Sequence, residues 1–263
     1  MNTSKPVNMN YLSTTWSIAR YSLLENYKNR FFGLFIIFAG VLIYASLLAG
    51  VMAVDEEARV LADLGLALME LISLAYALLA AADAITREIR TKTIYLVFSR
   101  PVPRPAYLAG KAAGLYAASA LMLGVMALIH LSLLYSRGFA APPFYAKAVF
   151  FIWCKLLIIT SAGLFISLFA TSTVSAVAIM GILWTLGHFT SEAQFLISRS
   201  SGASGLALKA VAYAIPDLQL FNARDLAASA AAPPAAGFLA VYLLLWLTVP
   251  YLFSLLLFRK KEF

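Results

Sequence analysis

Residues 31–54 read FFGLFIIFAGVLIYASLLAGVMAV, a run of 24 residues that contains no charged side chain. A helix that crosses the hydrocarbon core of a bilayer needs about 20 mostly apolar residues. Five further stretches have this character, although a few ionisable side chains interrupt them. They cover residues 66–85, 107–135, 149–170, 174–189 and 236–258. We therefore expect one all-α polytopic membrane domain, residues 1–263, with six transmembrane helices.

The composition of the whole chain agrees with a place in lipid. Hydrophobic residues make up 62% and charged residues 12%, whereas soluble domains are about half apolar and a quarter charged. The net charge of +8 does not predict nucleic-acid binding, because the Lys and Arg residues lie between apolar stretches. The single cysteine, Cys154, excludes an intrachain disulfide, and the two histidines, His130 and His188, form no metal or catalytic motif.

The distribution of cations predicts the orientation of the chain. With the N-terminus inside, twelve Lys and Arg residues fall in cytoplasmic segments and six in outer ones. Cytoplasmic loops carry such an excess in most membrane proteins. We therefore expect a multi-pass protein of the inner (plasma) membrane with both termini in the cytoplasm.

Two segments outside the spans have patterns of their own. In residues 10–30, apolar side chains recur every three or four positions, which favours an amphipathic helix in the cytoplasmic interface over a frayed tail. Residues 190–235 are rich in Ala and interrupted by Gly and Pro, so we expect short extracytoplasmic helices and a docking place for an outer partner. The residues predicted to carry the interfacial helix are Leu12, Trp16, Arg20, Leu23 and Tyr27.

The cytoplasmic connection after the second span reads TREIRTKTIYLVFSRPVPRP, residues 86–105. It begins with mixed charges, becomes apolar and aromatic, and ends in prolines that stop a helix. An apolar patch rimmed by cations in a short cytosolic loop predicts a surface for a partner protein. The alternative is that these residues lie back on the membrane surface or on neighbouring spans.

This connection, together with Leu108-Ala109-Gly110-Lys111 that follows it, resembles the signature of type-2 ABC transporter (ABC-2) permeases. In that family a Glu and a Thr precede an apolar run, then Ser-Arg-Pro, and then Gly-Lys in the next span. Pro103 stands where the family usually has Ser, which stiffens the loop. The layout is similar over nearly the whole chain, most closely to the small permeases of the nitrous-oxide-reductase maturation and gliding-associated systems.

The resemblance implies a fold like that of type V ABC exporters and a set of partners. Such permeases pair with a second copy or a close homologue and sit on two cytosolic ATPase subunits. The chain has no Gly-x-x-x-x-Gly-Lys-Ser/Thr motif, so ATP and Mg are expected on the partner ATPase and no cofactor on this chain. The resemblance makes residues 87–104 a coupling helix. Its predicted contact residues are Arg87, Glu88, Arg90, Lys92, Thr93, Tyr95, Phe98, Arg100 and Arg104.

Two acidic residues and two lysines lie within the predicted spans. Asp83 and Lys111 are near the cytoplasmic surface, where the side chains can reach water, and we expect a structural role for both. Glu70 and Lys155 are deeper, so they are predicted to pair and to line the outer half of a transport path. The alternative is an ion pair that serves packing only.

Three functions are compatible with these observations. The first is the permease subunit of an ATP-driven exporter. The second is a permease that transmits ATPase motion to an extracytoplasmic maturation or assembly partner at residues 190–235. The third is an intramembrane enzyme, for which the two histidines would have to converge with Glu70 or Glu192. The identity of a substrate does not follow from the sequence.

Overall fold

A computed structural model describes residues 11–53, 56–99, 102–200, 202–223 and 234–260. Every regular element in these ranges is a helix, which confirms the all-α class. The elements are α1 (Tyr11–Lys28), α2 (Arg30–Met52), α3 (Glu57–Arg90), α4 (Thr93–Phe98), α5 (Arg104–Ser136), α6 (Tyr145–Ser167), α7 (Thr173–Gly187), α8 (Thr190–Arg199), α9 (Gly202–Ala214), the 3-10 helix η1 (Gln219–Phe221) and α11 (Ala236–Lys260).

Five helices of the described residues, α2, α3, α5, α6 and α11, are long and apolar enough to cross a membrane. The predicted span at 174–189 corresponds to α7, which has only 15 residues and is therefore about 22 Å long. It reaches the length of a span only together with α8, and the two helices meet at a bend of 67°. The described residues thus contain five helices with the length of a span, and a sixth candidate only if α7 and α8 are counted together.

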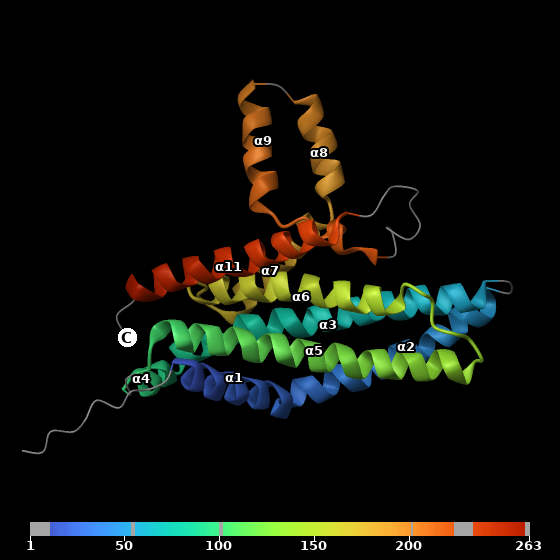
Figure 1. Cartoon of the computed structure of the whole chain (residues 1–263), viewed down its shortest axis with the longest axis horizontal. Helices are drawn as coiled ribbons and strands as arrows, with labels where there is room; N and C mark the ends of the chain where they lie inside the picture. Colours follow the sequence, from blue (N-terminus) through green and yellow to red (C-terminus); the bar gives the residue numbers. More distant parts are fainter. Residues whose placement is uncertain (1–10, 54–55, 100–101, 201, 224–233, 261–263) are drawn as a thin grey trace, which may run out of the picture.

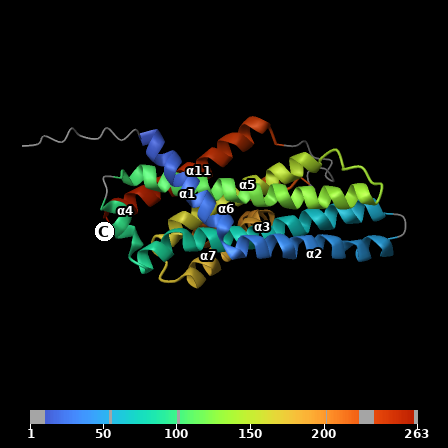
Figure 2. The same cartoon turned by 90° about the horizontal axis from the view of Figure 1, so that it is seen from below.

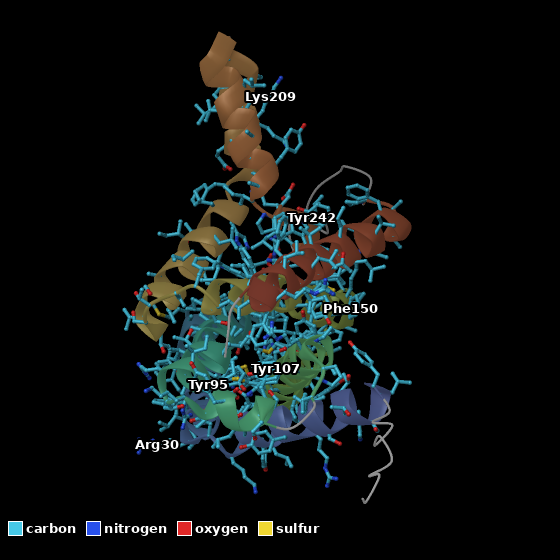
Figure 3. All side chains as sticks on the ribbon, turned by 90° about the vertical axis from the view of Figure 1, so that its left-hand side faces the viewer. Arg30, Tyr95, Tyr107, Phe150, Lys209 and Tyr242 are labelled. Atoms are coloured by element: carbon cyan, nitrogen blue, oxygen red, sulfur yellow. The ribbon has the colours of Figure 1, made fainter. Side chains whose placement is uncertain are left out.

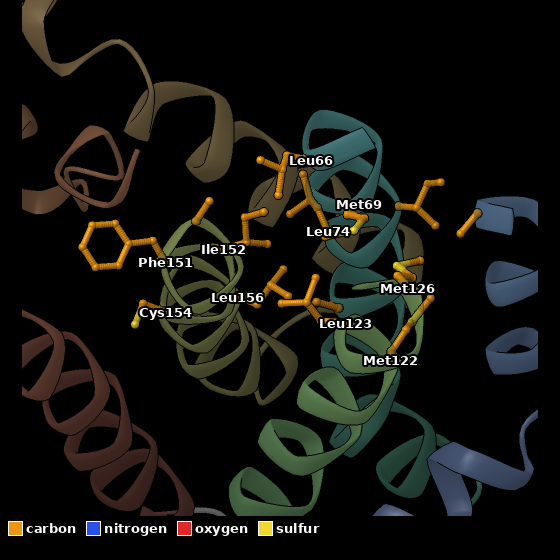
Figure 4. Packing of buried hydrophobic residues seen from close by; sticks show 14 of the residues in the cluster. Leu66, Met69, Leu74, Met122, Leu123, Met126, Phe151, Ile152, Cys154 and Leu156 are labelled. Atoms are coloured by element: carbon orange, nitrogen blue, oxygen red, sulfur yellow. The ribbon is translucent and has the colours of Figure 1, made fainter. Parts of the chain in front are cut away.

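The long helices lie side by side in one bundle, with α11 along one flank (Figure 1). Helix α6 is central. Of its most apolar stretch of 18 residues, 78% is buried, against 22% for α2 and 17% for α11. Close up, Ile152 and Leu156 of α6 face the side chains of α3 and α5, among them Met69 and Leu123 (Figure 4). The outer helices α2 and α11 therefore turn most of their apolar surface outward, as helices in contact with lipid do.

Helix α1 crosses the bundle obliquely and packs on α5 (Figure 2). The contact depends on two glycines of α5 spaced by four residues. A Cβ atom on Gly110 would lie 2.7 Å from Ile18 Cβ, and one on Gly114 would lie 2.5 Å from Ser22 Cβ. The Gly-x-x-x-Gly spacing therefore has a packing role here, because only glycine allows the two backbones to approach this closely.

Helices α8 and α9 form a hairpin, here called the arm, that stands away from the bundle (Figure 1). Polar contacts fix its base. The hydroxyl of Thr190 donates to Asp217 Oδ1 at 2.7 Å, the Asp217 backbone N–H donates to the Tyr242 hydroxyl at 2.6 Å, and Gln219 Nε2 donates to the His188 carbonyl at 2.6 Å. The arm forms the helices expected in residues 190–235, although 224–233 lie outside the described residues.

Candidate functional site

The bundle end that carries α4, here called the α4 end, is built by a sharp turn after α3. The Thr91 backbone N–H donates to the Arg87 carbonyl at 2.8 Å, and that of Lys92 donates to the Ile89 carbonyl at 3.2 Å. Lys92 has φ 59°, in the left-handed region, which ends a helix because the next peptide leaves the helical path. The chain therefore reverses within two residues and enters α4.

One face of α4 is anchored and the opposite face is exposed. Ile94 is fully buried, and the Phe98 ring lies 5.4 Å from that of Tyr107 and 5.6 Å from that of Phe258 between centroids. Tyr95 is 49% exposed and Leu96 71% exposed. Viewed from the α4 end, Tyr95 lies on the outside of the bundle, while Tyr107 lies nearer its axis (Figure 3). The helix thus presents an apolar and aromatic surface on a fixed support.

A buried charge cluster lies behind α4 and joins three helices. The ammonium of Lys111, whose side chain is 4% exposed, lies 2.5 Å from Glu88 Oε1 of α3 and 3.4 Å from Glu25 Oε2 of α1. The Tyr107 hydroxyl donates to the other Glu88 oxygen. Such charge-assisted contacts in a poorly hydrated site are strong and directional. The α4 end therefore has an internal framework that holds α1, α3 and α5 together.

The other polar residues of the α4 end either link two helices or are exposed charges. Arg104 Nη1 donates to the carbonyls of Phe258 and Arg259 at 2.9 and 3.0 Å, which ties α5 to the last turn of α11. The side chains of Arg87, Arg90 and Lys92 are exposed. They place positive charge in the last turn of α3 and at the N-cap of α4.

A second cluster of charges lies deep in the bundle, where α3, α6 and α7 meet. Lys155 Nζ donates to Glu70 Oε1 at 2.6 Å and lies 3.3 Å from His188 Nε2. The residue Lys155 is 1% exposed and Glu70 8% exposed. The predicted pairing of Glu70 with Lys155 is therefore formed, and His188 joins it, with its Nε2 3.7 Å from the same Glu70 oxygen.

The His188 ring is oriented by its own helix. Its Nδ1 lies 3.0 Å from the Trp184 carbonyl, and since a carbonyl only accepts, Nδ1 is the donor. In the neutral ring the lone pair is then on Nε2, which faces Lys155. Beside these groups is a cavity of about 210 Å³. It is lined by Ala67, Glu70, Leu71, Leu74, Lys155, Trp184, His188 and Asn222.

Residues 7–263, nearly the whole chain, match the family model described as ABC-2 family transporter protein. The chain belongs to this family. The resemblance found in residues 86–111 is confirmed, and the protein is a multi-pass permease component of an ABC transporter, a class that works with ATPase subunits. Comparison with the curated proteins finds no significant match.

The predicted coupling residues of this ABC-2 protein have different environments. Arg87, Arg90, Lys92 and Tyr95 lie on the surface of the α4 end, whereas Glu88 and Phe98 point into it. The Thr93 hydroxyl donates to the Glu88 carbonyl at 3.4 Å and helps to close the turn. Arg100 lies outside the described residues.

Helix α1 of the ABC-2 protein has one exposed and one buried face. Leu12, Trp16 and Tyr27 are exposed at 81%, 72% and 55%, Arg20 is exposed, and Leu23 is half-buried. The buried face is instead made of small residues such as Ala19 and Ser22. The aromatic stripe is thus available to an interface, while the small residues fit against α5.

Two residues were missed at the level of sequence. Lys111 has a structural role, since two carboxylates hold its ammonium inside the α4 end. His188 and Trp184 were not assigned to the deep cluster, although their spacing of four puts both on one face of the short fifth span. His130, by contrast, bonds to the Leu61 carbonyl and the Tyr145 hydroxyl, at 3.2 and 3.1 Å. Among the described residues, no group of three His, Cys, Asp or Glu is placed to hold a metal ion.

Proposed function

We propose that this ABC-2 protein is the transmembrane subunit of an ATP-driven exporter and that α4 is the element on which its ATPase subunits act. The α4 end then faces the cytoplasm, with both termini on that side. The transported molecule moves along a path that includes Glu70 and Lys155. Two permease copies and two ATPases form the complete transporter.

The observation that supports this proposal is the pair of opposite faces on α4. A helix of six residues has no stability of its own in water, yet Ile94 and Phe98 hold it against the bundle. A partner that presses on Tyr95 and Leu96 therefore moves the bundle rather than bending the loop. Aromatic side chains in such positions contribute much of the binding energy at protein interfaces.

The exposed cations give this contact an electrostatic preference. Arg87 and Arg90 lie in the last turn of α3 and Lys92 at the N-cap of α4, and Arg87 is only weakly neutralised by Asp83, at 3.8 Å. Charges at the rim of an interface mainly raise the association rate and select the partner. We expect the ATPase surface that receives α4 to be a hydrophobic cleft with an acidic border.

The test is the double variant Tyr95→Ala/Leu96→Ala in the full-length protein. We expect it to fold and enter the membrane, to lose most of the co-purifying ATPase and to fail to stimulate ATP hydrolysis. Tyr135→Ala is the control, because Tyr135 is also an exposed tyrosine, 64% against 49% for Tyr95, and lies at the opposite end of the bundle. If the double variant retains the ATPase as well as Tyr135→Ala does, α4 is not the coupling element.

A second candidate function is supported by the arm. Its base is fixed by Thr190, Asp217 and Gln219, but among the described contacts it packs on the bundle only there. Such an element is suited to transmit motion to an extracytoplasmic partner. A variant that lacks residues 191–214 separates the two functions: a transmitter loses its partner and its biological output, whereas an exporter keeps substrate-stimulated ATP hydrolysis.

A further inference from the structure

The ammonium of Lys155 is held by three groups that all attract cations. Glu70 Oε1 lies 2.6 Å from Nζ, His188 Nε2 lies 3.3 Å from it, and the centroid of the Trp184 ring lies 5.8 Å away. A carboxylate, an imidazole lone pair and an indole face are the components from which proteins build ammonium sites. Glu70 comes from α3, Trp184 from α7 and His188 from the C-cap of α7, and the lysine reaches them from α6.

The orientation of His188 is what makes the imidazole part of such a site. Because Nδ1 donates to the Trp184 carbonyl, the neutral ring offers an acceptor on the side of the ammonium. Trp184 takes part twice, through its carbonyl and through its ring. Trp184 and His188 thus act as one unit. Both direct a group that attracts cations toward the ammonium of Lys155.

Glu70, His188 and Trp184 are here called the cage. A cavity lies beside the cage, and an ion pair that serves packing only would not need this space. Its volume of about 210 Å³ is far above the roughly 10–15 Å³ that one water needs by the same measure. Ala67, Leu71 and Leu74 form an apolar wall next to the polar groups. The combination suits a ligand with a charged head and an apolar body.

The sign of the ligand charge follows from the lining residues. Apart from Lys155 itself, the described residues that line the cavity contribute one carboxylate and, with the His188 ring neutral, no cation. An anionic head would have to approach Lys155 beside the Glu70 carboxylate, which already lies 2.6 Å from the ammonium. A cationic head would find that same carboxylate favourable.

We infer that Glu70, His188 and Trp184 form a binding site for the ammonium group of a cationic amphiphile, and that Lys155 is a tethered competitor which fills this site in the closed bundle. The inference rests on the proposed transport function, because it names the substrate class of that path. Movement of α6 away from α3 and α7 withdraws the lysine and exposes the cage to the ligand.

The test replaces the tethered ammonium by a free one. Lys155→Ala removes three carbons and the ammonium, which together correspond to n-propylammonium. We expect this ion to raise the Tm of the purified full-length variant by about 3–6 °C at ten times its Kd. The isosteric alcohol propan-1-ol and the anion propionate should not raise it.

Two variants define the specificity of this rescue. In Lys155→Met the thioether fills the space, so n-propylammonium should have no effect; in Lys155→Ala/Glu70→Gln the carboxylate is lost, and the effect should disappear. Equal stabilisation by propan-1-ol or by propionate would overturn the inference, because it would show volume filling or anion binding. No ATPase is present in this assay, so its outcome is independent of whether α4 couples to one.

If Lys155→Ala cannot be purified, the wild-type cage is measured directly. The variant Trp16→Phe/Trp153→Phe/Trp246→Phe leaves Trp184 as the only tryptophan. In lipid nanodiscs its emission should change saturably with decylammonium and not with decanoate, and Glu70→Gln should abolish the change. An identical response to decylammonium in the Glu70→Gln protein would refute the site.

Discussion

The deep pair of Glu70 and Lys155 gives the strongest single prediction for stability. Removal of one member of a buried ion pair leaves a charge without compensation and costs about 3–5 kcal/mol, whereas replacement of both members by uncharged side chains costs little. Glu70→Gln and Lys155→Met should therefore each be strongly destabilising. The double variant should be close to wild type, so that the coupling energy has a magnitude of about 6–10 kcal/mol.

The single cysteine provides the assay. Cys154 is 2% exposed, so a thiol-reactive fluorogenic maleimide labels it only as the protein unfolds. For a protein of this size each kcal/mol changes Tm by about 2–4 °C. Each single variant should therefore lower Tm by about 6–20 °C.

A matched control is the ion pair of Arg137 and Glu57, at the end of the bundle opposite the α4 end. Arg137 is 2.5 Å from Glu57, but the two side chains are 41% and 22% exposed. Since water and salt screen such a pair, Arg137→Met should cost only about 0–1 kcal/mol. The reasoning is refuted if the two deep single variants lower Tm no more than this control, or if their effects simply add in the double variant.

Substitutions at three further positions, Gly114, Lys92 and Arg104, test the α4 end, and Gly124→Ala is a control. Gly114→Ala should destabilise the protein by about 1–3 kcal/mol, because its Cβ would lie 2.5 Å from a side chain of α1. A Cβ at Gly124 would meet nothing within 4 Å, so Gly124→Ala should be neutral or slightly stabilising in the same Tm assay. Lys92→Gly should raise stability by about 1–2 kcal/mol and Lys92→Val should lower it, because φ is 59° there; a Tm order of Val above Gly would contradict this account. Arg104→Gln should speed amide hydrogen exchange in the last turn of α11, whose carbonyls it caps, and unchanged exchange there would show that the cap is dispensable.

The sequence predicts most of the architecture because the main signal is local. Long apolar runs identify the long helices, and the spacing of three and four residues in residues 10–30 predicts the helix observed as α1. The lengths of the helices are less predictable. Helix α3 begins at Glu57 and ends at Arg90, far outside the apolar stretch 66–85, because charged residues can continue a helix beyond the bilayer.

The contacts between helices are the part that a single sequence does not specify. Lys111 could equally have extended to water, and only the positions of Glu25 and Glu88 in space decide that it stays inside. The participation of His188 likewise depends on how α7 lies against α3 and α6. Pairing of Glu70 with Lys155 could be proposed because charges deep in a membrane need partners. The participation of His188 could not be predicted in this way.

Helix α3 connects the two charge clusters, and it can therefore transmit a force applied at α4 to the cluster of Glu70 and Lys155. Glu88 and Glu70 are 18 residues apart on α3, about 27 Å at 1.5 Å per residue, and no Gly or Pro lies between them. The helix is therefore stiff over this distance. In contrast, α11 contains Pro250, and α7 is short and followed by a bend of 67°. We expect motion imposed at the α4 end to move Glu70 with α3, relative to Lys155 on α6, and so to open the ammonium cage.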